Sequence, residues 1–236
     1  MKLVIFDCDG VLINSEEIYV NSEIEFLSNA GFQIEKTAHM EAFMGLSYDD
    51  WRVKLGTAVQ ERNGHPLPEN FFESLHTFIM QRFDSELESI PGVRGAVSNL
   101  DIMCCVASSS GLQNLQWKLE HTGIADLFFS RIFSTDMVDR GKPAPDLFLH
   151  AAATLGMEPR HCVVVEDSAN GVIAGKLAGM KVIGFTGGDH CLADQETILI
   201  NNGADVVIGD FAKLGLTISR LAESTRAPAR RSASTI

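Results

Sequence analysis

The chain has 236 residues, of which 45% are hydrophobic, and its formal net charge is −12. This hydrophobic content is sufficient for a buried core and excludes disorder of the whole chain. The acidic charge argues against a nucleic-acid-binding protein, because such proteins normally carry a basic face.

Five short apolar runs rich in β-branched residues predict strands that are buried on both faces, as in a parallel sheet. These runs are Leu3–Phe6, Ile102–Ala107, Cys162–Val165, Lys181–Phe185 and Val206–Ile208. Helical patterns accompany the later runs, at Leu112–Thr122, Asp146–Leu155, Ala169–Leu177 and Ala193–Asn202. The alternation of strands and helices indicates an α/β fold with a doubly wound, mostly parallel sheet.

The long stretch between the first two predicted strands does not follow this alternation. Residues 15–87 look helical throughout, whereas a crossover between parallel strands needs only one helix. We therefore expect an inserted α-helical cap domain at residues 14–87 and a catalytic core made of residues 1–13 and 88–223. The segment 224–236 is small, polar and basic, and it is predicted to be a disordered tail.

Polar side chains follow three of the predicted strands, at the point where each strand ends. The carboxyl ends of parallel strands meet at one crevice, where open α/β sheets bind their ligands. Lys142, held by neighbouring prolines ahead of a predicted helix, is expected to join the crevice. The side chains that follow the strands are Asp7, Asp9, Ser108, Ser109, Ser110, Glu166 and Asp167.

The four acidic residues among them would repel one another if they met without a counter-ion. A hard divalent cation relieves this repulsion, and carboxylate and carbonyl oxygens suit Mg²⁺. With the metal bound, one carboxylate can attack phosphorus and form an aspartyl-phosphate. The metal, a lysine and hydroxyl donors would stabilise the transferring phosphoryl group. The expected partner is therefore a small phosphorylated metabolite.

Four segments resemble, in order, the four motifs of the haloacid dehalogenase superfamily: DCDGVLINSE, VASSS, GKPAPD and VVVEDSANG. The resemblance extends from Met1 to about Leu221. It is strongest for the subgroup with a helical cap after the first motif, which includes β-phosphoglucomutase and sugar-phosphate phosphatases. It implies a Rossmann-like core of the haloacid dehalogenase type and Mg²⁺ as cofactor.

The resemblance also implies a role for each acidic residue. Asp7 is the nucleophile and a Mg²⁺ ligand. Asp9 is the general acid and base, and its backbone carbonyl also reaches the metal. Asp167 ligates Mg²⁺, and Glu166 holds the ion directly or through water.

The remaining site residues act on the substrate in this scheme. Ser108 holds the phosphoryl oxygens, and Lys142 neutralises charge between the nucleophile and the phosphate. Ser109 and Ser110 either contact substrate or cap the next helix. The predicted cap-side candidates are Glu16, Tyr19, Tyr48, Asp49, Arg52, His76 and Arg82, among which Glu16 and Tyr48 are assigned to substrate binding. His190 is predicted to be a loop residue outside the site.

Asp9 favours phosphoryl transfer over dehalogenation, because an alkoxide leaving group needs a proton and a halide does not. Tyr48 and Gly111 stand where β-phosphoglucomutase has an arginine and a lysine for a second phosphate. This difference favours a phosphatase of sugar phosphates or phosphorylated sugar acids. A phosphosugar mutase and a non-catalytic phosphate-binding protein on the same fold remain open as alternatives.

The five cysteines follow neither a disulfide nor a zinc pattern, and so we expect a reducing, cytoplasmic setting. The apolar run before Asp7 is too short for a signal peptide, and no run is long enough to span a membrane. We therefore expect no membrane partner. No coiled coil or exposed apolar stripe is evident, which favours a monomer or a weak homo-oligomer.

Overall fold

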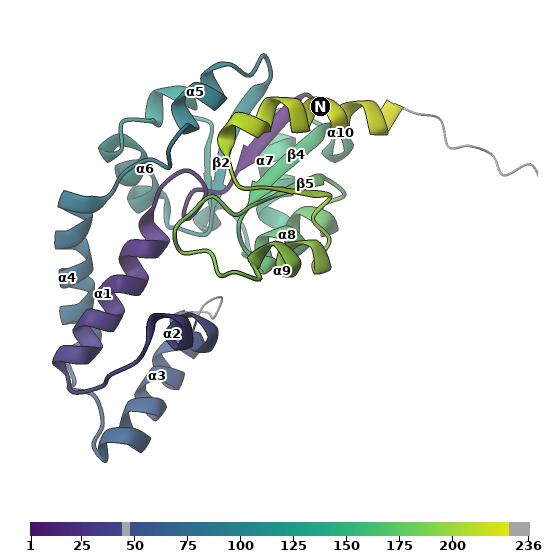
Figure 1. The fold of residues 1–236 in the computed structure, drawn as a ribbon. Coiled ribbons are helices and arrows are strands. Elements are labelled where there is room, and N and C mark those ends of the chain that lie inside the picture. The colour runs from purple at the N-terminus through teal and green to yellow at the C-terminus, as the bar shows by residue number, and fades with distance from the viewer. Residues whose placement is uncertain (44–47, 227–236) are drawn as a thin grey trace, which may run out of the picture.

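The computed structural model describes residues 1–43 and 48–226 (Figure 1). Its centre is one six-stranded sheet with the strand order β3-β2-β1-β4-β5-β6, in which every neighbouring pair is parallel. The strands are β1 (Leu3–Phe6), β2 (Met103–Ser108), β3 (Ile132–Ser134), β4 (Cys162–Glu166), β5 (Lys181–Phe185) and β6 (Val206–Ile208). The chain runs outward from β1 first on one side and then on the other, which confirms the predicted doubly wound α/β fold.

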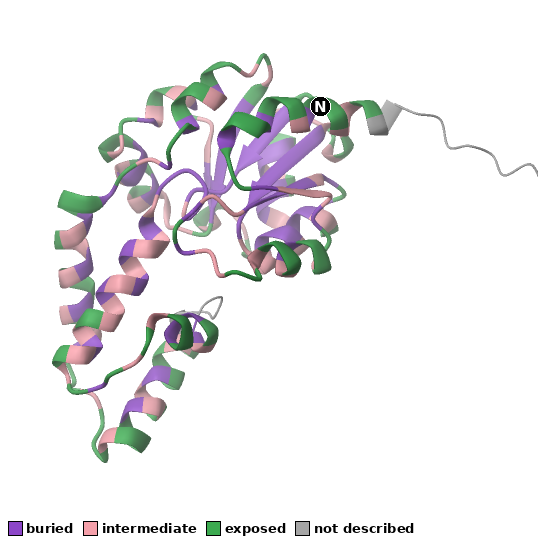
Figure 2. Cartoon of the chain, in the orientation of Figure 1, coloured by how far each residue is buried: buried purple, intermediate pink, exposed green. Residues whose placement is uncertain are grey.

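Helices cover both faces of this sheet, and successive residues of β1 show how. Val4 and Phe6 belong to the core on the face covered by α5 (Val93–Ser98), α6 (Leu112–His121) and α10 (Leu214–Arg226). Leu3 and Ile5 point to the opposite face, because side chains alternate along a strand. That face is covered by α7 (Asp146–Thr154), α8 (Ala169–Leu177) and α9 (Gln195–Asn201). The strands are accordingly buried throughout most of their length (Figure 2).

Four helices lie between β1 and β2 in the chain: α1 (Ser15–Asn29), α2 (Lys36–Phe43), α3 (Tyr48–Asn63) and α4 (Phe71–Glu86). They form a group beside the carboxyl end of β1 (Figure 1). Aromatic side chains join α1 to α4, with the Phe26 ring 5.2 Å from that of Phe71 and the Tyr19 ring 5.0 Å from that of Phe83. Because α1 begins soon after β1 ends, its first turn lies next to the carboxyl edge of the sheet.

Three elements were not predicted. β3 has the sequence Ile-Phe-Ser, without the run of β-branched residues that identified β6, and α5 is a short helix of six residues. α10 buries Leu214 and Ile218, which are one helical turn apart. It continues to Arg226, three residues into the predicted tail, and the rest of that segment, 227–236, lies outside the described residues.

Short 3₁₀ helices complete the chain at Ala125–Leu127, Thr135–Met137, Pro159–His161 and Phe211–Lys213. Within the described residues, no helix combines the length and the apolar character that crossing a membrane requires.

Candidate active site

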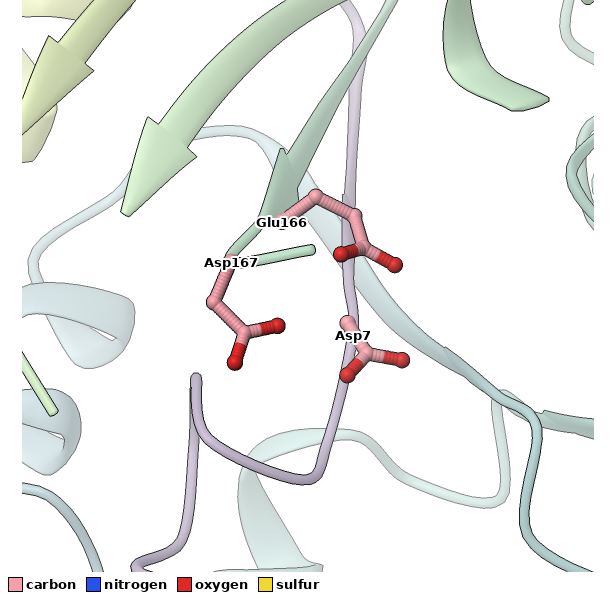
Figure 3. Close-up of side chains that lie close together, drawn as sticks. All are labelled: Asp7, Glu166 and Asp167. Carbon is pink, nitrogen blue, oxygen red and sulfur yellow. The ribbon is translucent and has the colours of Figure 1, made fainter. Parts of the chain in front are cut away.

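Three carboxylates meet at the carboxyl edge of the sheet. Asp7 follows β1, Glu166 ends β4 and Asp167 comes next in the chain (Figure 3). β1 and β4 are parallel neighbours with Phe6 opposite Val165, so their ends lie level. One carboxylate oxygen from each of the three residues lies within 4.8 Å of the others, and all three residues are buried.

Lys142 supplies positive charge to this group. Its Nζ lies 2.5 Å from Asp7 Oδ1 and 2.7 Å from Glu166 Oε1, and it also donates to the Ala107 carbonyl at 3.1 Å. One lysine does not balance three carboxylates. Burial raises the pKa of Asp7 well above its usual value, the charges of Glu166 and Asp167 raise it further, and Lys142 opposes them.

This donor set fits a hard divalent cation. It consists of carboxylate oxygens, and a cation among them would offset the remaining negative charge. Three of the predicted metal residues, Asp7, Glu166 and Asp167, make up this group, and the fourth, Asp9, was expected to add its backbone carbonyl.

The segment after β4 fixes the Glu166 carboxylate. Glu166 Oε2 accepts hydrogen bonds from the Ser168 backbone N–H at 3.0 Å and from Ser168 Oγ at 2.9 Å. Ser168 Oγ in turn accepts from the Gly171 N–H, which caps α8. A Cβ atom at Gly171 would overlap the Glu166 carboxyl group. A glycine is therefore required where α8 passes this carboxylate.

The carboxylate of Asp9 belongs to a different network. Its Oδ1 accepts from Ser15 Oγ at 2.5 Å and from Lys118 Nζ at 2.6 Å. Its Oδ2 accepts from Ser110 Oγ at 2.8 Å and from Ser108 Oγ at 3.3 Å. Burial alone would raise the pKa of Asp9, but the Lys118 charge and these hydrogen bonds lower it to about 2. Asp9 is therefore held as a carboxylate.

Lys118 was not among the predicted site residues. This lysine lies on α6 and is 1% exposed, beside the buried Leu115 and Leu119. The available signal was its position three residues after Leu115 and next to Leu119, on the apolar face of the helix. The resemblance directed attention to the position directly after the serine segment, where β-phosphoglucomutase has a lysine and this chain has Gly111.

The prediction for His190 was wrong. His190 does lie in a loop after β5, but it is 2% exposed, and its Nε2 lies 2.7 Å from Asp167 Oδ2. Burial lowers its pKa, yet the hydrogen bond and charge of Asp167 outweigh this effect and raise it to about 11. The loop reaches inward because glycines make room: a Cβ atom at Gly10 or Gly188 would strike the imidazole ring.

A cavity of about 1080 Å³ opens over these groups and extends toward α1–α4. Of the predicted cap-side candidates, Glu16, Tyr19 and His76 line it, together with Ser109 and Ser110. Burial first, and then the charges of Asp9 and Asp167, raise the pKa of Glu16 to about 7.

Two further cap-side candidates, Arg52 and Arg82, are not among the residues that line this cavity. Arg82 is paired with Glu86 at 2.7 Å, and Arg52 lines a smaller neighbouring hollow. The side chains of Tyr48 and Asp49 lie outside the described residues.

Comparison with known proteins gives consistent similarities. A family model described as haloacid dehalogenase-like hydrolase matches residues 4–185. The chain is 33% identical to hexitol phosphatase B of Escherichia coli over 182 residues, covering 76% of this chain and 81% of that protein. It is 28% identical to 6-phosphogluconate phosphatase of the same organism over 191 residues, covering 80% and 85%.

A solved structure gives the same result. The fold matches that of a conserved haloacid dehalogenase-like protein from Agrobacterium tumefaciens with a TM-score of 0.85. The two sequences are 35% identical, and the match covers 94% of this chain and 99% of that one.

Proposed function

Because the chain belongs to the haloacid dehalogenase-like hydrolases and is a phosphoric monoester hydrolase, we propose that it is a Mg²⁺-dependent phosphatase. The proposed reaction passes through an aspartyl-phosphate on Asp7. The observation that carries the proposal is the meeting of Asp7, Lys142 and Asp167 at one buried point. A nucleophile, a counter-charge and metal ligands are what phosphoryl transfer needs from a protein.

In the first step, an Asp7 carboxylate oxygen attacks phosphorus, and the bond from phosphorus to the leaving oxygen breaks. Lys142, in contact with Asp7, neutralises charge that gathers between nucleophile and phosphate. Ser108 binds the phosphoryl oxygens. Asp9, in its protonated form, gives a proton to the leaving oxygen.

In the second step, water attacks the aspartyl-phosphate and releases inorganic phosphate, which regenerates Asp7. Asp9 takes the proton from this water as general base. The hydrogen bonds from Lys118 and Ser15 favour the ionised form that this step requires.

Mg²⁺ would be held by Asp7, Asp167 and Glu166, with the backbone carbonyl of Asp9, and would supply positive charge for the phosphoryl oxygens. Helices α1–α4, within residues 14–87, form the cap domain, and residues 1–13 and 88–223 form the core. Closure of such a cap excludes bulk water from the reacting groups. The substrate contacts are Ser109, Ser110, Glu16 and Tyr48.

The substrate is a sugar phosphate or a phosphorylated sugar acid, which agrees with the names of two relatives, a hexitol phosphatase and a 6-phosphogluconate phosphatase. The protein works in the cytoplasm, because all five cysteines are free thiols and four of them are buried.

A turnover screen of phosphorylated metabolites, with and without Mg²⁺, tests this proposal. Asp7→Asn removes turnover and leaves the protein folded, whereas Asp101→Asn, on the exposed surface, leaves turnover unchanged. Release of free phosphate from a hexose 1-phosphate indicates hydrolysis, and an isomeric hexose phosphate indicates a mutase. The proposal fails when no phosphomonoester is hydrolysed in the presence of Mg²⁺.

A further inference from the structure

The cavity continues from the catalytic carboxylates into a space where the leaving group of a phosphomonoester would lie. We call this space the leaving-group chamber and define it by residues of α1, α2 and α4: Glu16, Glu23, His39, Glu41, Phe72 and His76. Its titratable side chains are thus three glutamates and two histidines. The chamber is the part of the site that meets the portion of the substrate that differs between metabolites.

The cations of the cavity are already committed at its phosphoryl end. Among the described residues that line it, only Lys118 and Lys142 are lysine or arginine. Lys118 lies 2.6 Å from Asp9, and Lys142 lies 2.5 Å from Asp7. His190 Nε2 likewise lies 2.7 Å from Asp167 Oδ2. Each of these three side chains is already in contact with a carboxylate.

Within the described part of the chain, no further lysine or arginine lines the chamber. Residues 44–49, which follow α2, have the sequence Met-Gly-Leu-Ser-Tyr-Asp and contain no lysine or arginine. The guanidinium of Arg52 lies 4.6 Å from the Phe72 ring centre, in the neighbouring hollow. Nε2 of the buried His39 lies 3.1 Å from Glu23, and so a proton on this histidine offsets only that glutamate.

Glu16 lies where the chamber meets the catalytic carboxylates. It lies in the first turn of α1, next to Ser15, whose hydroxyl binds Asp9. Its carboxyl pKa of about 7 reflects burial together with the charges of Asp9 and Asp167. A carboxylate or second phosphate on the leaving group would experience the same burial and the same charges. A bound Mg²⁺ does not remove this electrostatic cost of a second negative charge, because the phosphoryl group of the substrate carries compensating negative charge.

The other walls of the chamber suit an uncharged chain of carbons and hydroxyls. Trp51, Phe72, Leu75 and Ile79 give it an apolar side. Ionised carboxylates accept hydrogen bonds and donate none, and hydroxyl groups are the donors that match them. Apolar walls with a few fixed polar groups are typical of pockets for small ligands.

Building on the proposed phosphatase activity, we propose that this chamber selects phosphomonoesters of neutral polyols or sugars and rejects leaving groups that carry a second negative charge. Glu16 is the specificity-determining residue. The protein would then act on the phosphates of hexitols or hexoses, and poorly on phosphorylated sugar acids and bisphosphates.

A matched pair of substrates tests the selection. Sorbitol 6-phosphate and 6-phosphogluconate share one carbon chain and differ only at carbon 1, which is a hydroxymethyl group in the first and a carboxylate in the second. We expect kcat/KM to be about 10- to 100-fold higher for sorbitol 6-phosphate, the size of effect that charge repulsion at a partly buried site produces. p-Nitrophenyl phosphate serves as a substrate without the sugar chain.

Two glutamine variants on one helix then test the assignment. Glu16→Gln removes one of the three carboxyl groups of the chamber. In assays above the Glu16 pKa of about 7, where this group is ionised, we expect the variant to reduce the preference for sorbitol 6-phosphate by about tenfold. Glu17→Gln is the control, because Glu17 does not line the cavity and lies 3.7 Å from Lys36 on the outside of α1. A general loss of fold or activity would lower both rates together and leave their ratio unchanged.

The outcomes separate the two proposals. Absence of turnover of all three compounds with Mg²⁺ contradicts the phosphatase activity itself. Turnover of p-nitrophenyl phosphate combined with equal or faster turnover of 6-phosphogluconate, or with none of sorbitol 6-phosphate, overturns the selection alone. An unchanged substrate ratio in Glu16→Gln overturns the assignment to Glu16.

Discussion

Lys118 Nζ lies 2.6 Å from Asp9 Oδ1, although the two residues are 109 positions apart in the chain. Asp9 follows β1, and Lys118 reaches it from α6, where its side chain is buried among apolar neighbours. The lysine keeps Asp9 ionised against the opposing effect of burial. Asp9 therefore enters the proposed reaction in the form that accepts a proton from water, and protonation for the first step must overcome the Lys118 charge.

Lys118→Met tests this relationship through the pH dependence of turnover. The Asp9 pKa of about 2 is held below its usual value by Lys118, and so removal of the lysine charge raises it. We expect the acidic limb of the kcat profile, which reports ionised Asp9 as the base in hydrolysis of the aspartyl-phosphate, to move to higher pH in this variant. Lys118→Arg retains the charge and keeps the limb near its original position. An unmoved limb in Lys118→Met contradicts the proposed effect of Lys118 on Asp9.

The same pair predicts a change in folding stability. Asp9 is more acidic in the folded protein than in the unfolded chain. Its contribution to the free energy of unfolding is therefore complete at neutral pH and is lost as the pH falls toward about 2. Lys118→Met leaves a buried carboxylate without its cation, and we expect a loss of about 3–5 kcal/mol in the free energy of unfolding. Adding Asp9→Asn to Lys118→Met recovers part of this loss. Urea unfolding of the unaltered protein, the two single variants and the double variant measures the coupling energy between the two residues.

Lys142→Met is expected to reduce kcat strongly. Because it leaves the buried Asp7 and Glu166 without their cation, we also expect a loss of about 3–5 kcal/mol in the free energy of unfolding. Lys142 contacts both Asp7 and Glu166, and its charge is placed to stabilise the transferring phosphoryl group. Loss of one such interaction typically costs about 10²–10³ in kcat. Lys181→Met is the control, because it removes a comparable lysine–carboxylate pair, with Asp205, outside the cavity. Equal kcat values in the two variants would contradict the role of Lys142.

The acidic part of the site was predictable because its positions follow from strand pattern alone. Asp7 and Glu166 stand at the ends of apolar runs, and parallel neighbouring strands bring such ends together. Lys142 was expected at the same edge from its position between prolines ahead of a predicted helix, and the resemblance implied its role. The strand boundaries were nearly correct, although Ser108 and Glu166 are the last residues of their strands and do not follow them.

Lys118 and His190 were not predictable in the same way. Each reaches its carboxylate through tertiary packing, one from the buried side of α6 and one from a loop admitted by two glycines. A lysine on a helix is most often solvated, and a histidine in a glycine-rich loop is most often exposed. Only the positions of neighbouring elements identify these two as site residues.

Metal binding is testable without measuring turnover. Mg²⁺ at 100 times its dissociation constant is expected to stabilise the folded protein by about 2.7 kcal/mol, and thermal unfolding measures the effect. Asp167→Asn removes one carboxylate of the proposed ligand group and is expected to abolish most of the shift. Asp101→Asn, on the exposed surface, preserves it. A full Mg²⁺-dependent shift in Asp167→Asn shows that Asp167 is not a ligand.

Gly171→Ala tests whether the segment after β4 positions Glu166. A Cβ atom at residue 171 overlaps the Glu166 carboxyl group, which is buried and bound to Lys142 and Ser168. The carboxylate must move, and we expect a cost of about 1–3 kcal/mol in unfolding free energy and a decrease of about 10- to 100-fold in Mg²⁺ affinity.

Gly95→Ala is the matched control for this change. Gly95 lies on α5 with open space around its Cα, so an added methyl group meets no neighbouring atom. Alanine is the better helix former, and we expect this variant to gain up to about 1 kcal/mol and to bind Mg²⁺ normally. Calorimetric Mg²⁺ titration separates the two effects. If Gly171→Ala loses stability but binds Mg²⁺ as tightly as the unaltered protein, Glu166 supports the fold of this segment and does not hold the metal.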